Sequence, residues 1–307
     1  MHISIILPLY NAGPYVTRAI RSALQQVEVV EVIVIDDAST DEGYAQVQRV
    51  AAEDARVCLL RHPDGQNHGA GATRNLGLTL ATAEYVAFLD ADDYYLPNRF
   101  ARTKRVFAER TDTDGVYETI GVDYYDEEGK DKSLRHHRGN LRTGLRATNI
   151  LPGQLMEYLC THPGENIHLN GLTLKRQAIQ GHWCFDEGLR QAQDTDFIWQ
   201  LALNIRLYSS GSDMPVARRG VHAHNRVFDL AKVSYYRRQL AKKWYDRMLT
   251  ANWQPSINWY FTRLYLETAA RQRSWTKHKV TSYLFKAGGL LVLWVKHPWR
   301  LTKRLLG

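Results

Sequence analysis

Residues 84–100 read EYVAFLDADDYYLPNRF, and this stretch decides the fold. Within it, the apolar run 85–89, typical of a buried strand, is followed at once by Asp90, Asp92 and Asp93. Like charges this close together repel one another, and burying them without partners is costly. A cationic partner is therefore expected at the tip of this strand.

The chain before this stretch alternates between strand and helix. Strands are expected at 3–9, 30–36 and 56–61, and helices at 14–26, 41–53 and 71–82. In the first helix the apolar residues recur three and four positions apart, which places them on one face. The resulting βαβαβαβ order predicts an α/β fold with a parallel sheet and right-handed crossovers.

Polar residues follow three of these strands at the point where each strand ends. They are PLYN at 8–11, DDASTD at 36–41 and DADD at 90–93. Ligands of parallel α/β sheets bind at the carboxyl ends of the strands. The three segments therefore predict one binding site at this edge of the sheet.

The rest of the chain has weaker patterns. Residues 115–130 are expected to form a hairpin, and residues 169–179 a strand that runs into a helix. Helical spacing recurs at 194–203 and beyond about residue 230.

Composition limits the class of protein. With 307 residues and 44% hydrophobic residues, the chain can form one large domain or one domain with an appendage. Its cysteines, Cys58, Cys160 and Cys184, are odd in number and widely spaced, so they predict neither a disulfide framework nor a zinc site. They fit a reducing cytosol, and no signal peptide is expected because strand 3–9 begins almost at once.

The net charge of +8 is concentrated near the end of the chain. Residues 247–307 carry eleven Lys and Arg and one acid, a net +10, so residues 1–246 carry −2, the difference between +8 and +10. A nucleic-acid partner for the whole protein is therefore not expected. Residues 280–307 combine helical apolar spacing with Lys, Arg and Trp, which favours either a helix lying on an anionic membrane surface or one packed against the rest of the protein or a partner.

The aspartates of 90–93 suit a metal ion. Asp90 and Asp92 stand one residue apart on an exiting strand and can share Mg²⁺ or Mn²⁺, which in turn bridges the oxygens of a diphosphate. The alternative is a turn with solvated aspartates. Nearby, Asp37 could accept from a nucleotide base and Tyr10 could stack on one, or Tyr10 could be a core aromatic. Ser39 or Thr40 is expected to cap the next helix.

Three further residues have a functional and a structural interpretation. Arg74 follows a glycine-bearing loop that departs from the dinucleotide-binding pattern but can cradle an anion. Asp194 could act as a general base or simply favour the dipole of the helix it starts. His222, or the neighbouring His224, could complete a metal shell with Asp92 or lie on the surface.

Taken together, SIILPLYN, VIVIDDASTD, GATRNLG, the opening stretch, QDTDF and RRGVHAHNR resemble family 2 glycosyltransferases of the GT-A fold. The resemblance is close over 3–110, partial over 168–226 and absent from the last 80 residues. It implies a Rossmann-like, mostly parallel sheet flanked by helices, with a helical basic C-terminal extension. The implied domains are a catalytic domain, 1–228, and a helical region, 229–307. Within the first, 1–110 would bind the nucleotide sugar and 111–228 the acceptor.

The resemblance also implies roles for particular residues. Pro8, Tyr10 and Asp37 would bind the nucleoside of the donor, with Asp37 facing the base. Arg74 would lie near the diphosphate, and Asp90 near the ribose or a metal-bound water.

The resemblance assigns metal binding and catalysis to three other residues. Asp92 would be the direct metal ligand, and His222 fits the late histidine of the family better than His224. Asp194 would be the catalytic base, although Gln193 replaces the commoner glutamate before it.

The implied activity is an inverting, metal-dependent transfer from a nucleoside-diphosphate sugar, UDP-linked as is commonest in the family, to a hydroxyl of a saccharide or lipid-linked saccharide. The protein would act in bacterial surface-polysaccharide or glycolipid synthesis, in the cytoplasm and peripherally on the inner face of the cell membrane. Two alternatives stay open. A sugar-nucleotide nucleotidyltransferase usually has a Gly-rich, Lys/Arg-bearing loop after its first strand, where this chain has YNAGP (10–14). A non-catalytic sugar-nucleotide-binding protein would have no need for Asp92 and Asp194.

Overall fold

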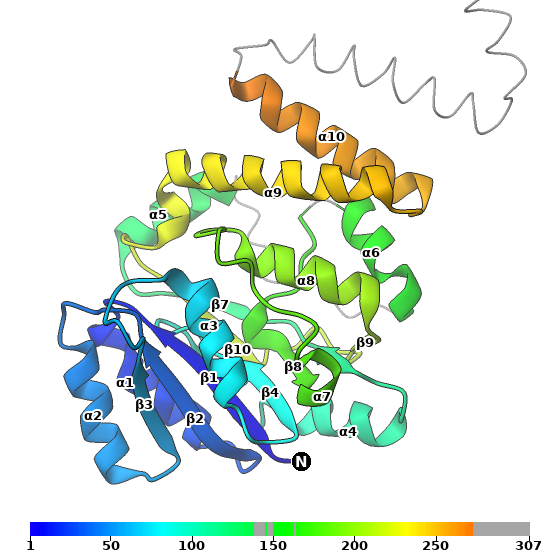
Figure 1. Ribbon diagram of the computed structural model, residues 1–307. Helices are drawn as coiled ribbons and strands as arrows, with labels where there is room; N and C mark the ends of the chain where they lie inside the picture. Colours follow the sequence, from blue (N-terminus) through cyan, green and yellow to red (C-terminus); the bar gives the residue numbers. More distant parts are fainter. Residues whose placement is uncertain (138–144, 146–149, 163, 273–307) are drawn as a thin grey trace, which may run out of the picture. The chain divides into compact units, whose positions relative to one another are not determined.

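The computed structural model describes residues 1–137, 145, 150–162 and 164–272 (Figure 1). The chain divides into two compact units, Met1–Val233 and Ser234–Gly307. All strands described below, and all candidate site residues, belong to the first unit. The functional division of the first unit at residue 110 stays a prediction.

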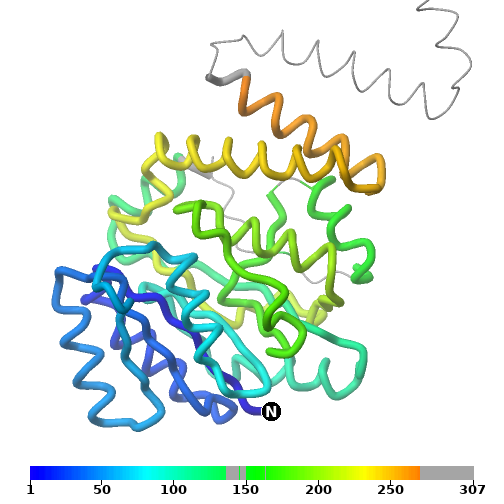
Figure 2. Tube along the Cα trace, in the orientation of Figure 1, coloured from blue at the N-terminus to red at the C-terminus, as the bar shows by residue number. Residues whose placement is uncertain are grey.

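The first hundred residues have the expected alternation. The elements are β1 (Ile3–Leu9), α1 (Gly13–Leu24), β2 (Val29–Asp36), α2 (Gly43–Glu53), β3 (Val57–Arg61), α3 (Gly69–Leu80) and β4 (Tyr85–Phe88). Strand β1 is parallel to both β2 and β4, and β2 is parallel to β3. Figure 2 traces this parallel half from blue to cyan. The predicted parallel sheet is confirmed.

The two faces of β1 are covered by different helices. Ile3, Ile5, Leu7 and Leu9 are buried in one cluster with the predicted apolar stripe of α1. Side chains alternate along a strand, so Ile6 points to the opposite face, toward α3. There a β-carbon on Gly77 would lie 2.5 Å from Cγ2 of Ile6. Glycine at this position lets α3 approach the sheet closely.

The second half completes the sheet with antiparallel pairing. Strand β8 (Leu172–Lys175) pairs antiparallel with β4 and with β6 (Gly115–Tyr117), and β9 (Leu207–Ser209) runs parallel to β6. The strand order is β3-β2-β1-β4-β8-β6-β9. The predicted strand-to-helix passage at 169–179 is confirmed, because β8 runs into α7 (Arg176–Ile179).

The predicted hairpin at 115–130 is wrong. Strand β7 (Gly121–Tyr124) belongs to a separate sheet with β10 (Ala217–Val221) and β5 (Tyr94–Tyr95), in the order β5-β10-β7. Between β6 and β7 the chain is held by buried Glu118, which accepts from Arg99 Nη1 at 2.6 Å and Arg102 Nε at 3.1 Å. The segment therefore passes from one sheet to the other without turning back on itself.

Helices make up most of the remaining described residues. They are α4 (Ala101–Glu109), α5 (Glu127–His137), α6 (Pro152–Thr161), α8 (Gln193–Asn204), α9 (Leu230–Thr250) and α10 (Pro255–Gln272), with the 3-10 turns η1 (Leu169–Gly171) and η2 (Arg226–Phe228). In the second unit Trp244 is fully buried and stacks on Phe261, with ring centres 5.1 Å apart.

The predicted membrane contact of the C-terminal region stays a prediction. Among the described residues, none of the helices has the length and apolarity needed to cross a membrane. The segment 280–307, on which the membrane-surface prediction depends, lies outside the described residues.

Candidate functional site

The three aspartates after β4 have three different sets of partners. Asp90 Oδ1 accepts a hydrogen bond of 2.5 Å from Arg74 Nη2, and Arg74 is only 4% exposed. Burial raises the pKa of Asp90, but the positive charge and the hydrogen bond of Arg74, together with the charge of Arg226, outweigh it and leave this pKa below its ordinary value. Asp90 is therefore an ionised carboxylate with a buried cation of its own.

Asp93 is buried and points away from solvent, with only 3% of its surface exposed. Its carboxyl oxygens accept from the side-chain amide of Asn170 and, at 2.7 Å, from the backbone N–H of Gly220. Burial and the charges of Asp92 and Asp90 raise the pKa of Asp93 well above its ordinary value. A shift in this direction favours a proton on Asp93 and so reduces the repulsion among the three groups.

Asp92 contacts the predicted histidine. Its Oδ2 lies 3.3 Å from His222 Nε2 and 3.1 Å from Asn225 Nδ2, and its side chain is 29% exposed. In the described part of the chain, no Lys or Arg side chain makes an ion pair with Asp92. Of the three aspartates, Asp92 is thus the one whose charge is left for a bound cation to neutralise.

An aromatic stack fixes the ring of His222. The ring lies 4.9 Å from that of Tyr15 at an interplanar angle of 23°, and Tyr15 stacks on Tyr125, also at 4.9 Å. The Tyr125 hydroxyl donates to the carbonyl oxygen of Asp92 at 2.9 Å. Nδ1 of His222 is buried and has no hydrogen-bond partner among the described residues, so the stack on Tyr15 adds to the contact of Nε2 with Asp92 in orienting the ring.

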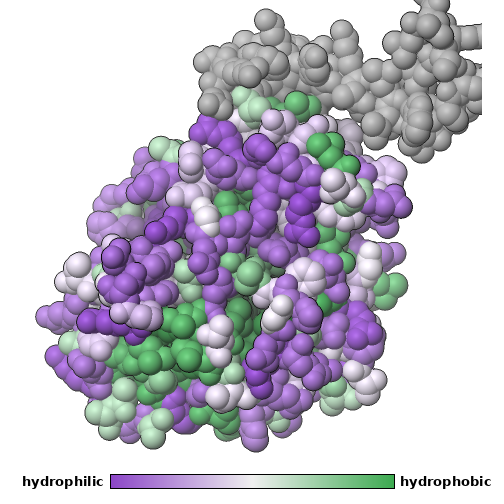
Figure 3. Space-filling view, in the orientation of Figure 1, coloured by the Kyte–Doolittle hydropathy of each residue, from purple (hydrophilic) through white to green (hydrophobic). Residues whose placement is uncertain are grey.

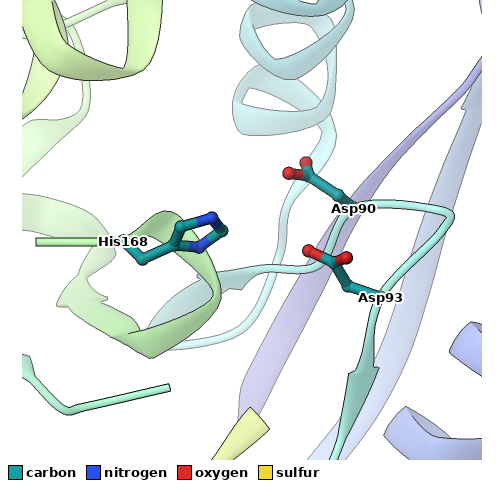
Figure 4. Close-up of side chains that lie close together, drawn as sticks. All are labelled: Asp90, Asp93 and His168. Atoms are coloured by element: carbon teal, nitrogen blue, oxygen red, sulfur yellow. The ribbon is translucent and has the colours of Figure 1, made fainter. Parts of the chain in front are cut away.

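A second histidine, missed from the sequence, lies on the other side of the loop. Figure 4 shows His168 pointing toward Asp90 and Asp93, and the potential ligand atoms of the three lie within 4.8 Å of one another. Burial and the charge of Arg219 lower the pKa of His168 to about 4, so its ring is neutral near pH 7.

The hydrogen bonding of His168 argues against a metal in this cluster. Its Nδ1 accepts from the backbone N–H of Asn170 at 3.3 Å. A neutral imidazole with an acceptor at Nδ1 carries its proton on Nε2, where it donates and has no lone pair for a metal. We therefore interpret His168 as a neutral ring beside Asp90 and Asp93 and not as a metal ligand.

The antiparallel part of the fold clamps the aspartate loop. The side chain of Asn170 accepts from the backbone N–H of Asp90 at 3.2 Å and donates to Asp93. On the other side, a β-carbon on Gly220 would lie 2.1 Å from the carbonyl oxygen of Asp92. Only glycine allows β10 to approach the loop so closely while its N–H bonds to Asp93.

Asp37 has a structural task at the predicted nucleoside site. It is 2% exposed, and its oxygens accept from the backbone N–H groups of His68 at 2.6 Å and Gly69 at 2.9 Å, where α3 begins. Its own N–H donates to the carbonyl of Leu9 at 2.8 Å and so ties the ends of β1 and β2 together. Each carboxylate oxygen keeps further acceptor capacity. Contact with a base stays a prediction.

The predicted capping of α2 by Ser39 or Thr40 is wrong. Asp41 takes that place, with Oδ1 accepting from the N–H of Gly43 at 2.9 Å and Oδ2 accepting from the N–H of Gly13 at 2.8 Å. Ser39 instead accepts from the N–H of Asn11. The two oxygens of the Asp41 carboxylate thus serve the starts of α1 and α2 together.

Pro8 and Tyr10 lie at the same edge of the sheet. Pro8 is half-buried within β1, whereas Tyr10 follows the strand and is 39% exposed. The guanidinium carbon of Arg226 lies 6.0 Å from the centre of the Tyr10 ring. The ring of Tyr10 is thus accessible at the edge where Asp90 and Arg226 interact.

Asp194 comes from α8, which follows the antiparallel part of the sheet in the chain. It is the second residue of α8, and its Oδ1 accepts from the N–H of Thr195 at 2.7 Å, which satisfies one donor of the helix start. Its negative charge lies near enough to His168 to oppose the lowering of that pKa. Asp90, His168 and Asp194 therefore share one electrostatic neighbourhood.

Comparison with known proteins places these features in a family. Residues 4–162 match the family model of glycosyl transferase family 2, about half of the chain. The succinoglycan biosynthesis protein ExoO of Rhizobium meliloti is 38% identical over 135 residues, 43% of this chain and 36% of that protein. The first curated relatives found are matched over only 31–40% of their own length.

Solved structures share the fold at low sequence identity. S. aureus TarS 1–349 in complex with UDP-GlcNAc aligns with a TM-score of 0.62 and 19% identity, covering 91% of this chain and 74% of that one. The mannosyltransferase PcManGT of Pyrobaculum calidifontis, in complex with GDP-Man and Mn²⁺, aligns with a TM-score of 0.55 and 16% identity over 98% and 82% of the two chains. At these identities the likeness supports the fold alone.

Proposed function

Because this chain belongs to glycosyltransferase family 2, we propose that it transfers a sugar, with inversion, from a nucleoside-diphosphate sugar to a hydroxyl of a saccharide or lipid-linked saccharide. One observation carries the proposal: the Asp92–His222 pair, Asp90 with its arginine and Asp194 converge at the carboxyl edge of the parallel sheet. A UDP-linked donor and a role in surface-polysaccharide or glycolipid synthesis are part of the proposal. TarS with UDP-GlcNAc and the succinoglycan protein support these two points by analogy.

The proposed reaction needs one base and one stabilised leaving group. Asp194 accepts the proton of the acceptor hydroxyl, and the hydroxyl oxygen forms a bond to the anomeric carbon from the face opposite the diphosphate. The bond between that carbon and the phosphate oxygen breaks, and the nucleoside diphosphate leaves with the electron pair. Arg74, held beside Asp90, adds positive charge where negative charge develops.

Asp92 and His222 suit a divalent ion, Mn²⁺ or Mg²⁺. Adjacent ligands of an octahedral ion with bonds of about 2.1 Å lie about 3 Å apart, and Oδ2 of Asp92 and Nε2 of His222 are separated by 3.3 Å. When bound, such an ion would supply positive charge to the diphosphate. The complex of PcManGT with GDP-Man and Mn²⁺ supports the choice by analogy.

The test is turnover on a panel of sugar nucleotides with Mn²⁺ or Mg²⁺, with EDTA as control. Metal-dependent release of nucleoside diphosphate is expected, and its rate should rise when a suitable saccharide acceptor is added. Pyrophosphate release from a nucleoside triphosphate would instead identify a nucleotidyltransferase. Binding without any turnover would identify a non-catalytic sugar-nucleotide-binding protein.

The stack on Tyr15 gives a prediction for the metal. Tyr15→Ala should weaken Mn²⁺ binding about tenfold or more, because groups that orient a metal ligand typically contribute 10- to 100-fold to affinity. Tyr15→Phe keeps the ring and should bind Mn²⁺ as the wild type does. The measurement is titration of free Mn²⁺ by EPR in the presence of UDP. Equal affinities for Tyr15→Ala and the wild type would contradict the assignment.

Attachment to membranes through the basic C-terminal region is also part of the proposal. It would bring the active site near a lipid-linked acceptor in the cytoplasm, at the inner face of the cell membrane. The segment that would make this contact, 280–307, is the one to delete when membrane fractionation is measured.

A further inference from the structure

A pocket of about 380 Å³ opens beside the candidate site, entirely within the first unit. This volume is within the range of small-molecule sites, about 300–1,000 Å³. Its wall includes Asn225, which contacts Asp92, and Gln191, three residues before Asp194. The pocket thus lies between the segment that holds the proposed metal ligands and the segment that carries the proposed base.

Among the charged residues that line the pocket, cations outnumber carboxylates. Lys132 of α5, Arg226 and Lys232 of α9 contribute three positive side chains, and Asp229 is the one carboxylate. Figure 3 shows a hydrophilic surface over α5 and the start of α9. Two segments far apart in the sequence, α5 and the stretch 223–232, therefore bring positive charge to one cavity.

These cations keep capacity to bind an anion. Lys132 Nζ lies 2.8 Å from Glu128 and donates to the carbonyl of Ala223 at 3.2 Å, and Lys232 Nζ lies 3.2 Å from Asp229. The guanidinium of Arg226 makes no ion pair within the described residues, and its charge reaches Asp90. The side-chain oxygen of Gln191 is buried without a hydrogen-bond partner in that same part of the chain. A ligand that carries both an anionic group and a hydroxyl could satisfy the cations with the first and the oxygen of Gln191 with the second.

We propose that this pocket binds an anionic group on the acceptor, a phosphate or a carboxylate, and so selects a charged acceptor over a neutral saccharide. The inference rests on the proposed function and names the class of its acceptor. An acceptor group is favoured over the donor diphosphate for two reasons. The pocket is bordered by the segment before Asp194, the proposed base, and Lys132 lies on α5 rather than in the parallel half, where the nucleoside site is proposed.

The test uses phenyl phosphate and benzoate as probes, titrated by calorimetry into the full-length protein saturated with UDP and Mg²⁺. Phenyl phosphate should bind more tightly than phenol, and 0.5 M salt should weaken it. The double variant Lys132→Gln/Lys232→Gln should raise its Kd at least fivefold. The exposed Lys104→Gln on α4 is the matched control and should leave this Kd unchanged. A preference for phenyl phosphate or benzoate distinguishes a phosphate-bearing from a carboxylate-bearing acceptor.

Three outcomes would overturn the inference. If phenyl phosphate binds the wild type without UDP but not when UDP is saturating, the pocket holds the diphosphate of the donor. If the double variant and Lys104→Gln weaken binding equally, the attraction is only that of net charge. If neither probe binds the wild type better than phenol, the pocket has no anion site. None of these results affects the turnover of sugar nucleotides, which tests the proposed function separately.

Discussion

Replacing Asp92 by alanine is expected to lower kcat/KM for sugar transfer by at least about 10³-fold. Of the three aspartates after β4, Asp92 is the one that is neither buried nor, within the described residues, ion-paired with a Lys or Arg side chain, so its charge is the one available to a metal ion. Charge stabilisation by a bound metal ion is worth several kcal/mol, and about 4 kcal/mol corresponds to this loss of rate. The same variant should lose the part of UDP affinity that depends on Mn²⁺.

The variant should fold normally. The side chain of Asp92 is 29% exposed, and the hydrogen bond of Tyr125 goes to its backbone carbonyl, which alanine retains. Thermal unfolding and UDP binding in EDTA check this point. Asp92→Asn, which keeps the shape and removes the charge, should be nearly as inactive, whereas the exposed Asp213→Ala should match the wild type. Turnover of Asp92→Ala near the wild-type rate would refute the assignment of Asp92.

The parallel half of the fold could be predicted because its signals are local. Each apolar run of 3–9, 30–36, 56–61 and 85–89 is a complete strand signal, and the helices between them dictate parallel pairing. The hairpin prediction at 115–130 failed for the opposite reason. Strands β6 and β7 pair with β8, β9 and β10, which lie about 50 to 100 residues further along the chain. Local periodicity contains no information about such partners.

The same distinction separates the site residues that were predicted from those that were missed. Asp90, Asp92 and Asp194 stand in short recognisable motifs. His168 and Asn170 reach the aspartates only because β8 inserts antiparallel beside β4. The sequence around these two residues contains no pattern that predicts this pairing. Tyr15 looks like an ordinary first-turn residue of a helix, and its stacking on His222 depends on a segment more than 200 residues away.

Asp37 shows the limit of a motif on its own. The sequence places it where a ligand is expected, and the fold also uses its oxygens to satisfy two N–H groups at the start of α3. The residue is therefore needed for the architecture of the edge whatever it contributes to base recognition. A loss of activity on mutation of Asp37 would thus not distinguish between these two tasks.

Asp194→Asn is expected to reduce kcat by about 10²- to 10⁴-fold, the usual contribution of a general base, while donor affinity stays unchanged. Asparagine keeps an oxygen that can accept from the N–H of Thr195, so the start of α8 should be preserved. It cannot take the proton of the acceptor hydroxyl. The measurements are kcat with saturating acceptor and, separately, Kd for UDP with Mn²⁺.

This combination of results separates the base from a structural role. If Asp194 only stabilised α8, the variant would have a lower midpoint of thermal unfolding. The turnover rate per folded molecule would stay unchanged. Asp213→Asn serves as the control for the loss of one negative charge from an exposed site. An Asp194→Asn variant that folds normally and retains the wild-type kcat would show that another group takes the proton. The nearby His168 could not replace it without a large change in its buried surroundings, because its Nδ1 is already bonded to the N–H of Asn170.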